Sequence, residues 1–171
     1  KDSKLQRIVW RKKINFQSKL PSIIYSNEFF DCFPVRQFIL KKKWFEKYVS
    51  FNKKENKFFF KDVLVNDKKL LSLLTLYKNQ KLLEISYERN KYFNKICEYI
   101  KNKGGVFFTI DYGYFNNNKN FSLQAIQGHK YSHILENIGE KDISSHVNFE
   151  DLRNIADKNK LHIEEYTTQR D

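Results

Sequence analysis

The spacing of apolar and polar residues along the chain predicts short strands that alternate with helices, and hence an α/β fold with a mainly parallel sheet. Two apolar runs closed by polar residues, 22–26 and 106–110, are typical of strands buried in a parallel sheet. Between them, the apolar positions of 87–103 repeat at helical spacing, and Gly104 supplies a stop signal for that helix. The other predicted elements are strands at 82–86 and 161–166 and helices at 67–81 and 149–159, the last capped by Asn148.

A stretch with a different pattern, 35–65, stands between the first strand and these later elements. It holds three runs of aromatic and β-branched residues, separated by the lysines at 41–43 and the polar residues at 52–56. Such runs with polar turns predict a β-meander. The plain interpretation is an extra β layer that completes the core.

Polar residues gather directly after the two predicted parallel strands. In parallel α/β sheets, ligands bind beyond the carboxyl ends of the strands, although Asn and Asp also close ordinary turns. An irregular stretch is expected over 114–147, and a loop of that length in a compact domain usually has a function. The candidate turn residues are Asn27, Glu28 and Asp31 after the first strand and Asp111, Tyr112 and Gly113 after the second.

The net charge of +12 comes from 26 lysines and 6 arginines against 20 acidic residues. A basic chain can bind nucleic acid, an acidic membrane surface or an acidic protein. Specific recognition of bases and phosphates favours arginine, whereas a lysine excess beside many Asn, Ile, Phe and Tyr residues is what an AT-rich genome produces. Nucleic acid is therefore not the expected partner, and a steep loss of affinity with salt would be its signature.

The composition excludes several other classes. With 40% hydrophobic residues, 16% aromatics, 5 glycines and 2 prolines, the chain is neither disordered nor collagen-like. No apolar run approaches the roughly 20 residues that span a bilayer. Cys32 and Cys97 are expected to be free thiols, and no metal is expected because the cysteines and histidines lack ligand spacing. The sequence begins at Lys1 and lacks methionine, so we expect an N-terminal part to be missing.

Five motifs occur in the order found in a known enzyme family. The segment 26–38, SNEFFDCFPVRQF, resembles the NEFFDALPVRQF signature of the MidA-type methyltransferases, with Cys32 and Phe33 in place of Ala-Leu. The segments GGVFFTIDYGY at 104–114, SLQAIQGH at 122–129 and SHVNF at 145–149 resemble GGxxLxIDYGY, TLQAVRGH and AHVDF of the same family. TTQR at 167–170 resembles its closing TQG or TQR.

The resemblance covers about residues 8 to 171 and implies an S-adenosyl-L-methionine (SAM) dependent methyltransferase. The family includes the mitochondrial complex I assembly arginine methyltransferase. The implied fold is the C-terminal part of a Rossmann-like class I SAM methyltransferase sheet, with 35–65 as an inserted β-meander that faces the substrate. The implied substrate is a protein arginine, in a subunit of respiratory complex I. The implied location is the cytoplasm of a bacterium, or the mitochondrial matrix of a eukaryote.

The resemblance also implies roles for residues in the motifs. Methyl transfer needs alignment of nucleophile, methyl group and sulfur, and acidic groups can fix a guanidinium by charge-assisted hydrogen bonds. Glu28 is the expected guanidinium clamp, Asn27 orients cofactor or substrate, and Asp31 is either catalytic or structural. Ser26 and Asn27 are the candidate cofactor-binding residues. The candidate substrate-binding residues are Arg36, Gln37, Asp111, Tyr112, Gly113, Gln124, His129 and His146, the two histidines being either general bases or hydrogen-bonded structural residues.

One family feature does not occur in the sequence. SAM methyltransferases carry a glycine-rich loop after their first strand, and no GxGxG pattern exists in these 171 residues. We therefore expect the chain to be the C-terminal part of the domain, without the cofactor-binding half, and to supply the acceptor side of the cleft. The alternative is a non-catalytic remnant or an assembly module of a split methyltransferase. The resemblance further implies that the strand at 22–27 pairs with the missing first strand, and without that strand an open apolar sheet edge favours self-association.

Overall fold

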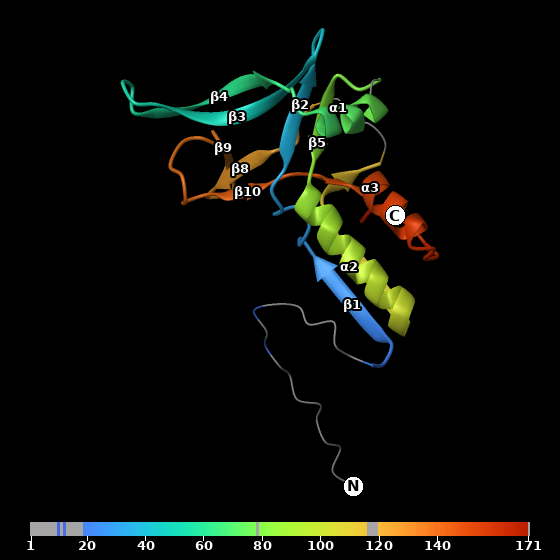
Figure 1. Cartoon of the computed structure of the whole chain (residues 1–171). Helices are drawn as coiled ribbons and strands as arrows, with labels where there is room; N and C mark the ends of the chain where they lie inside the picture. Colours follow the sequence, from blue (N-terminus) through green and yellow to red (C-terminus); the bar gives the residue numbers. More distant parts are fainter. Residues whose placement is uncertain (1–9, 11, 13–18, 78, 116–119, 171) are drawn as a thin grey trace.

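The computed structural model describes residues 10, 12, 19–77, 79–115 and 120–170. These residues form a mixed α/β fold, as predicted, with two separate hydrophobic cores. One core lies between a long helix and a short parallel sheet, and the other lies beside an antiparallel sheet (Figure 1).

The first core is built on two parallel strands and a helix. Strand β1 (Ser22–Asn27) pairs residue for residue with β6 (Gly105–Ile110). One face of this pair packs against helix α2 (Tyr87–Lys103) through Phe93 and Ile96. Parallel strands are normally covered on both faces, so the exposure of the second face is unusual. That face carries Ile23, Tyr25, Val106 and Phe108.

Helix α2 begins and ends where the sequence predicts. The Ser86 hydroxyl caps its start by accepting the N–H of Arg89, which satisfies one of the unpaired donors of the first turn. Gly104 ends the helix with φ at 77°, and its N–H donates to the Ile100 carbonyl at 2.7 Å. A left-handed residue at this position favours glycine, so the stop signal acts as expected.

The second core lies beside an antiparallel sheet of four strands. Three of them occupy the runs predicted within 35–65, and their hairpin end projects from the rest of the fold (Figure 1). A strand also forms near 82–86 as predicted, but it runs antiparallel to its neighbour, so the expected mainly parallel sheet is wrong. The chain re-enters this sheet directly beside its first strand and in the opposite direction. The strand order is β4 (Lys57–Leu64), β3 (Trp44–Asn52), β2 (Arg36–Leu40) and β5 (Leu82–Ile85).

A short helical segment connects β4 to β5. Asp67 caps helix α1 (Lys68–Leu74) by accepting the N–H of Leu70 at 2.7 Å, and the 3-10 turn η1 (Thr75–Tyr77) follows. The helix is shorter than the predicted 67–81, and position 78 lies outside the described residues. Its buried Leu74 joins the second core, which also contains Phe38, Trp44, Val65, Leu83 and Ile85.

The described residues of 114–147 are largely irregular, as expected, but they also form short strands that the sequence does not predict. Strands of two to four residues contain no apolar run that a sequence pattern could reveal, and residues 116–119 lie outside the described part. β8 pairs antiparallel with β9 and β10, and β7 pairs parallel with β11. The strands are β7 (Gly113–Tyr114), β8 (Gln124–Gln127), β9 (Lys130–Ser132), β10 (Asp142–Ser144) and β11 (Val147–Asn148).

Helix α3 (Phe149–Lys158) follows, and the Asn148 side chain caps it by accepting the N–H of Glu150 at 3.1 Å. This helix and its cap are confirmed. The strand predicted at 161–166 is wrong, because this segment has no ladder partner among the described residues. Its apolar side chains, Leu161 and Ile163, pack against the first core instead.

Candidate acceptor site at the carboxyl ends of β1 and β6

The carboxyl ends of β1 and β6 meet, as parallel pairing requires. The Glu28 N–H donates to the Ile110 carbonyl at 2.9 Å. The Ser26 hydroxyl donates to Thr109 Oγ1 at 2.8 Å, which ties this candidate cofactor residue to the neighbouring strand. The two turns that the sequence singles out are therefore hydrogen-bonded neighbours, and their predicted convergence is confirmed.

Asp111 shapes the turn that carries the other candidates. Its Oδ2 accepts the backbone N–H groups of Phe29 at 3.1 Å and Phe30 at 2.8 Å. Its Oδ1 accepts the N–H of Tyr112 at 3.0 Å. Burial raises the pKa of Asp111, while the three N–H donors act in the opposite direction. The carboxylate of Asp111 thus faces the backbone of the turn and holds it in shape.

Glu28 stands at the exposed tip of this turn in a left-handed backbone conformation. Its φ is 47°, which costs a non-glycine residue about 1 kcal/mol or more. The Glu28 carboxylate lies near the Tyr112 hydroxyl, and its charge raises the pKa of Tyr112. Tyr112 is 57% exposed, and Asn27 is exposed as well. The turn therefore presents a carboxylate, a phenol and an amide to solvent.

Asp31 lies half-buried in the same turn. Burial raises the pKa of Asp31, and the charges of Asp111 and Glu28 raise it further. Its backbone carbonyl accepts the N–H of Ser145 at 2.9 Å, which joins the turn to a segment far along the chain. The Asp31 carboxyl group therefore takes up a proton more readily than an ordinary aspartate.

The segment 145–147 completes the cluster. The Val147 N–H donates to the Tyr112 carbonyl at 2.7 Å. The His146 N–H donates to the Ser122 hydroxyl at 2.9 Å. The structure thus brings the backbone of His146 close to both turns, although this segment follows β1 by more than a hundred residues in the sequence.

Gly113 permits the close approach of this segment. A side chain at this position would collide with the Val147 carbonyl and with the ring of Phe149. Gly113 pairs directly with Val147 in the β7–β11 ladder. Packing alone therefore requires glycine here.

The two candidates on β2 bind carboxylates of neighbouring strands. Arg36 forms a two-pronged ion pair with Glu46, in which the Nε–Oε1 and Nη2–Oε2 distances are both 2.6 Å. Gln37 is buried and donates from Nε2 to Glu84 Oε1 at 2.8 Å. Both side chains therefore stabilise the antiparallel sheet.

The remaining candidates lie on the small sheet. Gln124 donates to the Ser144 hydroxyl at 3.3 Å and so links β8 to β10. His129 is exposed in the turn between β8 and β9, with φ at 62°. Among the described residues, no hydrogen bond joins His129 to the turns after β1 and β6, so it stands apart from the cluster.

Two buried charged residues connect these segments, and sequence reasoning missed both. Arg89 is 4% exposed and Glu84 is 9% exposed. Glu84 accepts the N–H and hydroxyl of Ser122 and the N–H of Leu123. A signal existed, because Glu84 interrupts the apolar run of β5 and Arg89 lies on the apolar face of α2. A charge at a buried position needs polar partners.

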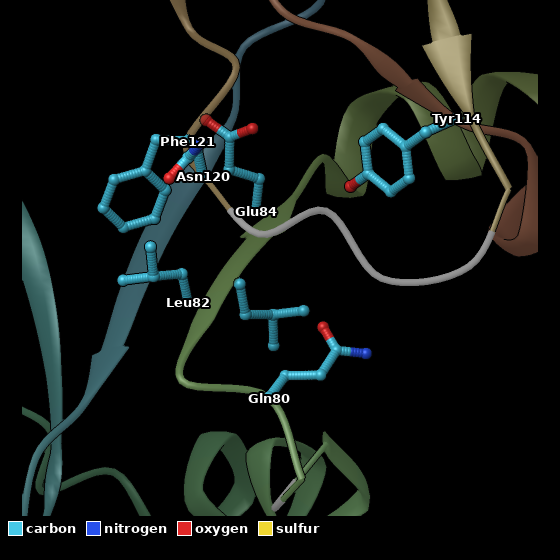
Figure 2. Close-up of a pocket in the computed structure, with 7 residues that line it drawn as sticks. Gln80, Leu82, Glu84, Tyr114, Asn120 and Phe121 are labelled. Atoms are coloured by element: carbon cyan, nitrogen blue, oxygen red, sulfur yellow. The ribbon is translucent and has the colours of Figure 1, made fainter.

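A shallow hollow, open to solvent, borders Glu84 (Figure 2). The Tyr114 hydroxyl points towards it, and burial raises the pKa of Tyr114 to about 12, with a further contribution from Glu84. This phenol therefore stays protonated at neutral pH. The lining residues are Gln80, Leu82, Leu83, Glu84, Tyr114, Asn120 and Phe121, and the predicted site residues are not among them.

The described part of the chain contains no group of three or more His, Cys, Asp or Glu side chains arranged to hold a metal ion. Both cysteines are free thiols, Cys32 exposed and Cys97 buried. Within the same part of the chain, no helix is both long and apolar enough to cross a membrane.

Comparisons with known proteins agree with this architecture. The chain is 30% identical over 146 residues to the mitochondrial protein arginine methyltransferase NDUFAF7 homolog of Caenorhabditis elegans, a match that covers 83% of this chain and 34% of the relative. It is 26% identical over 156 residues to the Drosophila melanogaster homolog, covering 86% and 35%. The chain thus spans about a third of the length of these curated relatives.

Two solved structures share the fold. A COG1565 superfamily member from Burkholderia thailandensis, solved bound to S-adenosyl-homocysteine, aligns with a TM-score of 0.73 at 19% identity, over 90% of this chain and 41% of that one. A native structure of a COG1565 superfamily protein from the same organism aligns with a TM-score of 0.74 at 18% identity, over 90% and 42%.

A family model matches a larger share of the chain than these individual proteins do. The family described as "Putative S-adenosyl-L-methionine-dependent methyltransferase" matches residues 1–167, which is nearly the whole chain. The chain therefore belongs to this family of SAM-dependent methyltransferases.

Proposed function

We propose that this chain supplies the acceptor side of the cleft in a SAM-dependent protein arginine methyltransferase. The observation that carries the proposal is the strained Glu28, held at the exposed carboxyl end of β1 beside Tyr112. The names of the curated relatives support arginine as the acceptor. A subunit of respiratory complex I is the proposed substrate, in the bacterial cytoplasm or the mitochondrial matrix.

The described residues do not form a complete SAM site. The ribose and carboxylate of SAM need close backbone approach, which glycines after a strand allow. Of the five glycines, none follows β1, and the space beside Gly113 is filled by Val147 and Phe149. We therefore place the cofactor cradle outside these 171 residues. In this proposal, β1 and β6 are the C-terminal part of a Rossmann-like sheet, and 35–65 is an insertion into it.

The residues of the turn suit the binding of a guanidinium group. A carboxylate can accept two N–H bonds from arginine in a planar, two-pronged geometry. In this proposal Glu28 provides that carboxylate, and the nearby Tyr112 phenol, whose pKa the Glu28 charge raises, stands beside it as a neutral donor. Asn27 orients the ligand from the strand end. Because the reaction depends on alignment, a turn held rigid by Asp111 lowers the cost of placing the acceptor.

The test is a methyl-transfer assay on the full-length protein that contains this chain. Substitution Glu28→Gln keeps the shape of the side chain but removes the charge that clamps the guanidinium. We expect kcat to fall about 100-fold with little change in KM for SAM. Glu98→Gln, at an exposed position of α2, is the matched control and should keep wild-type kcat. Equal kcat for the wild type and Glu28→Gln would refute the clamp.

A second candidate is a non-catalytic remnant or assembly module, and the exposed face of the β1–β6 pair favours it. Tyr25 and Phe108 stack on that face at 5.8 Å between ring centroids, and Ile23 is 85% exposed. Such a surface normally packs against another layer. Methyl transfer by the full protein would exclude this candidate, whereas stable capture of a partner by an inactive full protein would support it.

A further inference from the structure

Arg89 is a buried cation that contacts only neutral acceptors. Its Nε donates to the Phe30 carbonyl at 2.8 Å. Its Nη2 donates to the Ser145 hydroxyl at 2.8 Å and to the Ser145 carbonyl at 3.4 Å, and its Nη1 donates to the His146 carbonyl at 3.1 Å. No ion pair of Arg89 exists among the described residues.

Burial of such a charge is expensive, so the placement needs a physical reason. Burial lowers the pKa of Arg89, and the charge of Asp111 is the largest influence in the opposite direction. An apolar side chain would fill the same space without this cost. It could not, however, bond two separate backbone segments at once, which the planar guanidinium does with donors on three nitrogens.

The contacts of Arg89 fix two peptide segments from opposite sides. Phe30 is held at its N–H by Asp111 and at its carbonyl by Arg89. His146 is held at its N–H by Ser122 and at its carbonyl by Arg89. Ser122 is anchored in turn by the buried Glu84. Each segment is therefore clamped at both backbone groups, and Arg89 is the shared member.

We propose that Arg89 is a positioning residue, whose guanidinium sets the turn that carries Glu28 at a fixed distance from the segment that carries His146. This inference rests on the proposed function, because it assigns Arg89 the task of arranging the acceptor site. Arg89 acts through Phe30 and His146 and does not itself touch the acceptor.

The test compares Arg89→Lys with wild type in the full protein. Lysine keeps the positive charge but carries its donors on one nitrogen, so it cannot reach both segments. We expect kcat to fall at least 10-fold, with KM for SAM within twofold of wild type, in protein that circular dichroism shows to be folded. Arg153→Gln, which removes an exposed arginine from α3, is the control and should keep wild-type kcat. Wild-type kcat in folded Arg89→Lys would overturn the inference.

Two further measurements keep the outcome decisive. If Arg89→Lys does not fold, Ser145→Ala removes one of the four bonds and should lower kcat in the same direction by a smaller factor. If the wild-type protein shows no methyl transfer, the proposed function fails, and amide NMR then decides the inference alone. Shifted resonances of both Glu28 and His146 in Arg89→Lys or Ser145→Ala support it, and unchanged resonances overturn it.

Discussion

The carboxylate of Asp111 holds the candidate turn, so its removal should loosen the turn and destabilise the fold. Asp111→Ala deletes the acceptor of three backbone N–H groups, those of Phe29, Phe30 and Tyr112. Asp111→Asn is the finer change. Its amide oxygen can keep the two bonds that Oδ2 accepts, but its NH₂ group then faces the Tyr112 N–H.

The size of the effect follows from which donors can find water. Tyr112 is exposed, so its N–H is readily hydrated, whereas Phe30 is fully buried and its N–H would be left unpaired. A hydrogen bond to a charged group contributes about 1.5–3 kcal/mol, and an unpaired buried donor costs about 1–3 kcal/mol. Removal of the carboxylate also removes the cost of burying its charge, the same cost that raises the pKa of Asp111, and this offsets part of the loss. We expect the free energy of unfolding to fall by about 2–4 kcal/mol in Asp111→Ala and by about 1–2 kcal/mol in Asp111→Asn.

Urea denaturation followed by circular dichroism measures both free energies of unfolding. At this chain length, the alanine variant should also unfold about 5–15 °C below wild type. Asp157→Asn, at an exposed position 3.9 Å from Arg153, is the control and should change stability by about 0.5 kcal/mol or less. If both Asp111 variants match that control, the carboxylate does not hold the turn and the reasoning is refuted.

Three further predictions follow from single features of the structure. Gly113→Ala places a methyl group against the Val147 carbonyl and the Phe149 ring, so it should destabilise the fold by about 2 kcal/mol or more in the same denaturation assay; wild-type stability would show that β7 and β11 can separate freely. Burial raises the pKa of Cys97 to about 12, so a thiol reagent should modify only Cys32 in the folded chain and both thiols in denaturant. The pKa of Cys32 is also raised, so its reaction should become faster as the pH rises and more of it is thiolate. Two reactive thiols in the folded chain would contradict this. Ile23→Lys should reduce self-association of the isolated chain in sedimentation experiments, because it puts a charge on the exposed apolar sheet face; an already monomeric wild-type chain would argue against association through that face.

The sequence predicts well where local signals are strong. The predicted signals at Gly104 and Asn148 mark helix ends because each satisfies backbone groups within a few residues. The closeness of the turns after β1 and β6 also follows from sequence, since two buried parallel strands that pair must end together.

The failures have a common physical cause, which is dependence on distant partners. Whether 82–86 pairs parallel or antiparallel depends on its neighbour in the sheet, and 161–166 forms no strand because no partner strand lies beside it. The positions of Arg89 and Glu84 depend in the same way on backbone groups 38 to 59 residues away. Pattern alone therefore locates the candidate turn but not the buried charges that support it.

The central claim is that this chain supplies the acceptor side of a methyltransferase cleft and that the cofactor cradle lies outside it. Calorimetric titration with SAM tests this most directly, with the folded 171-residue chain and the full protein measured side by side and circular dichroism as the folding control. We expect saturable binding at micromolar SAM or tighter by the full protein and no saturable binding by the chain. Micromolar binding by the chain alone, or no binding by either, would contradict it.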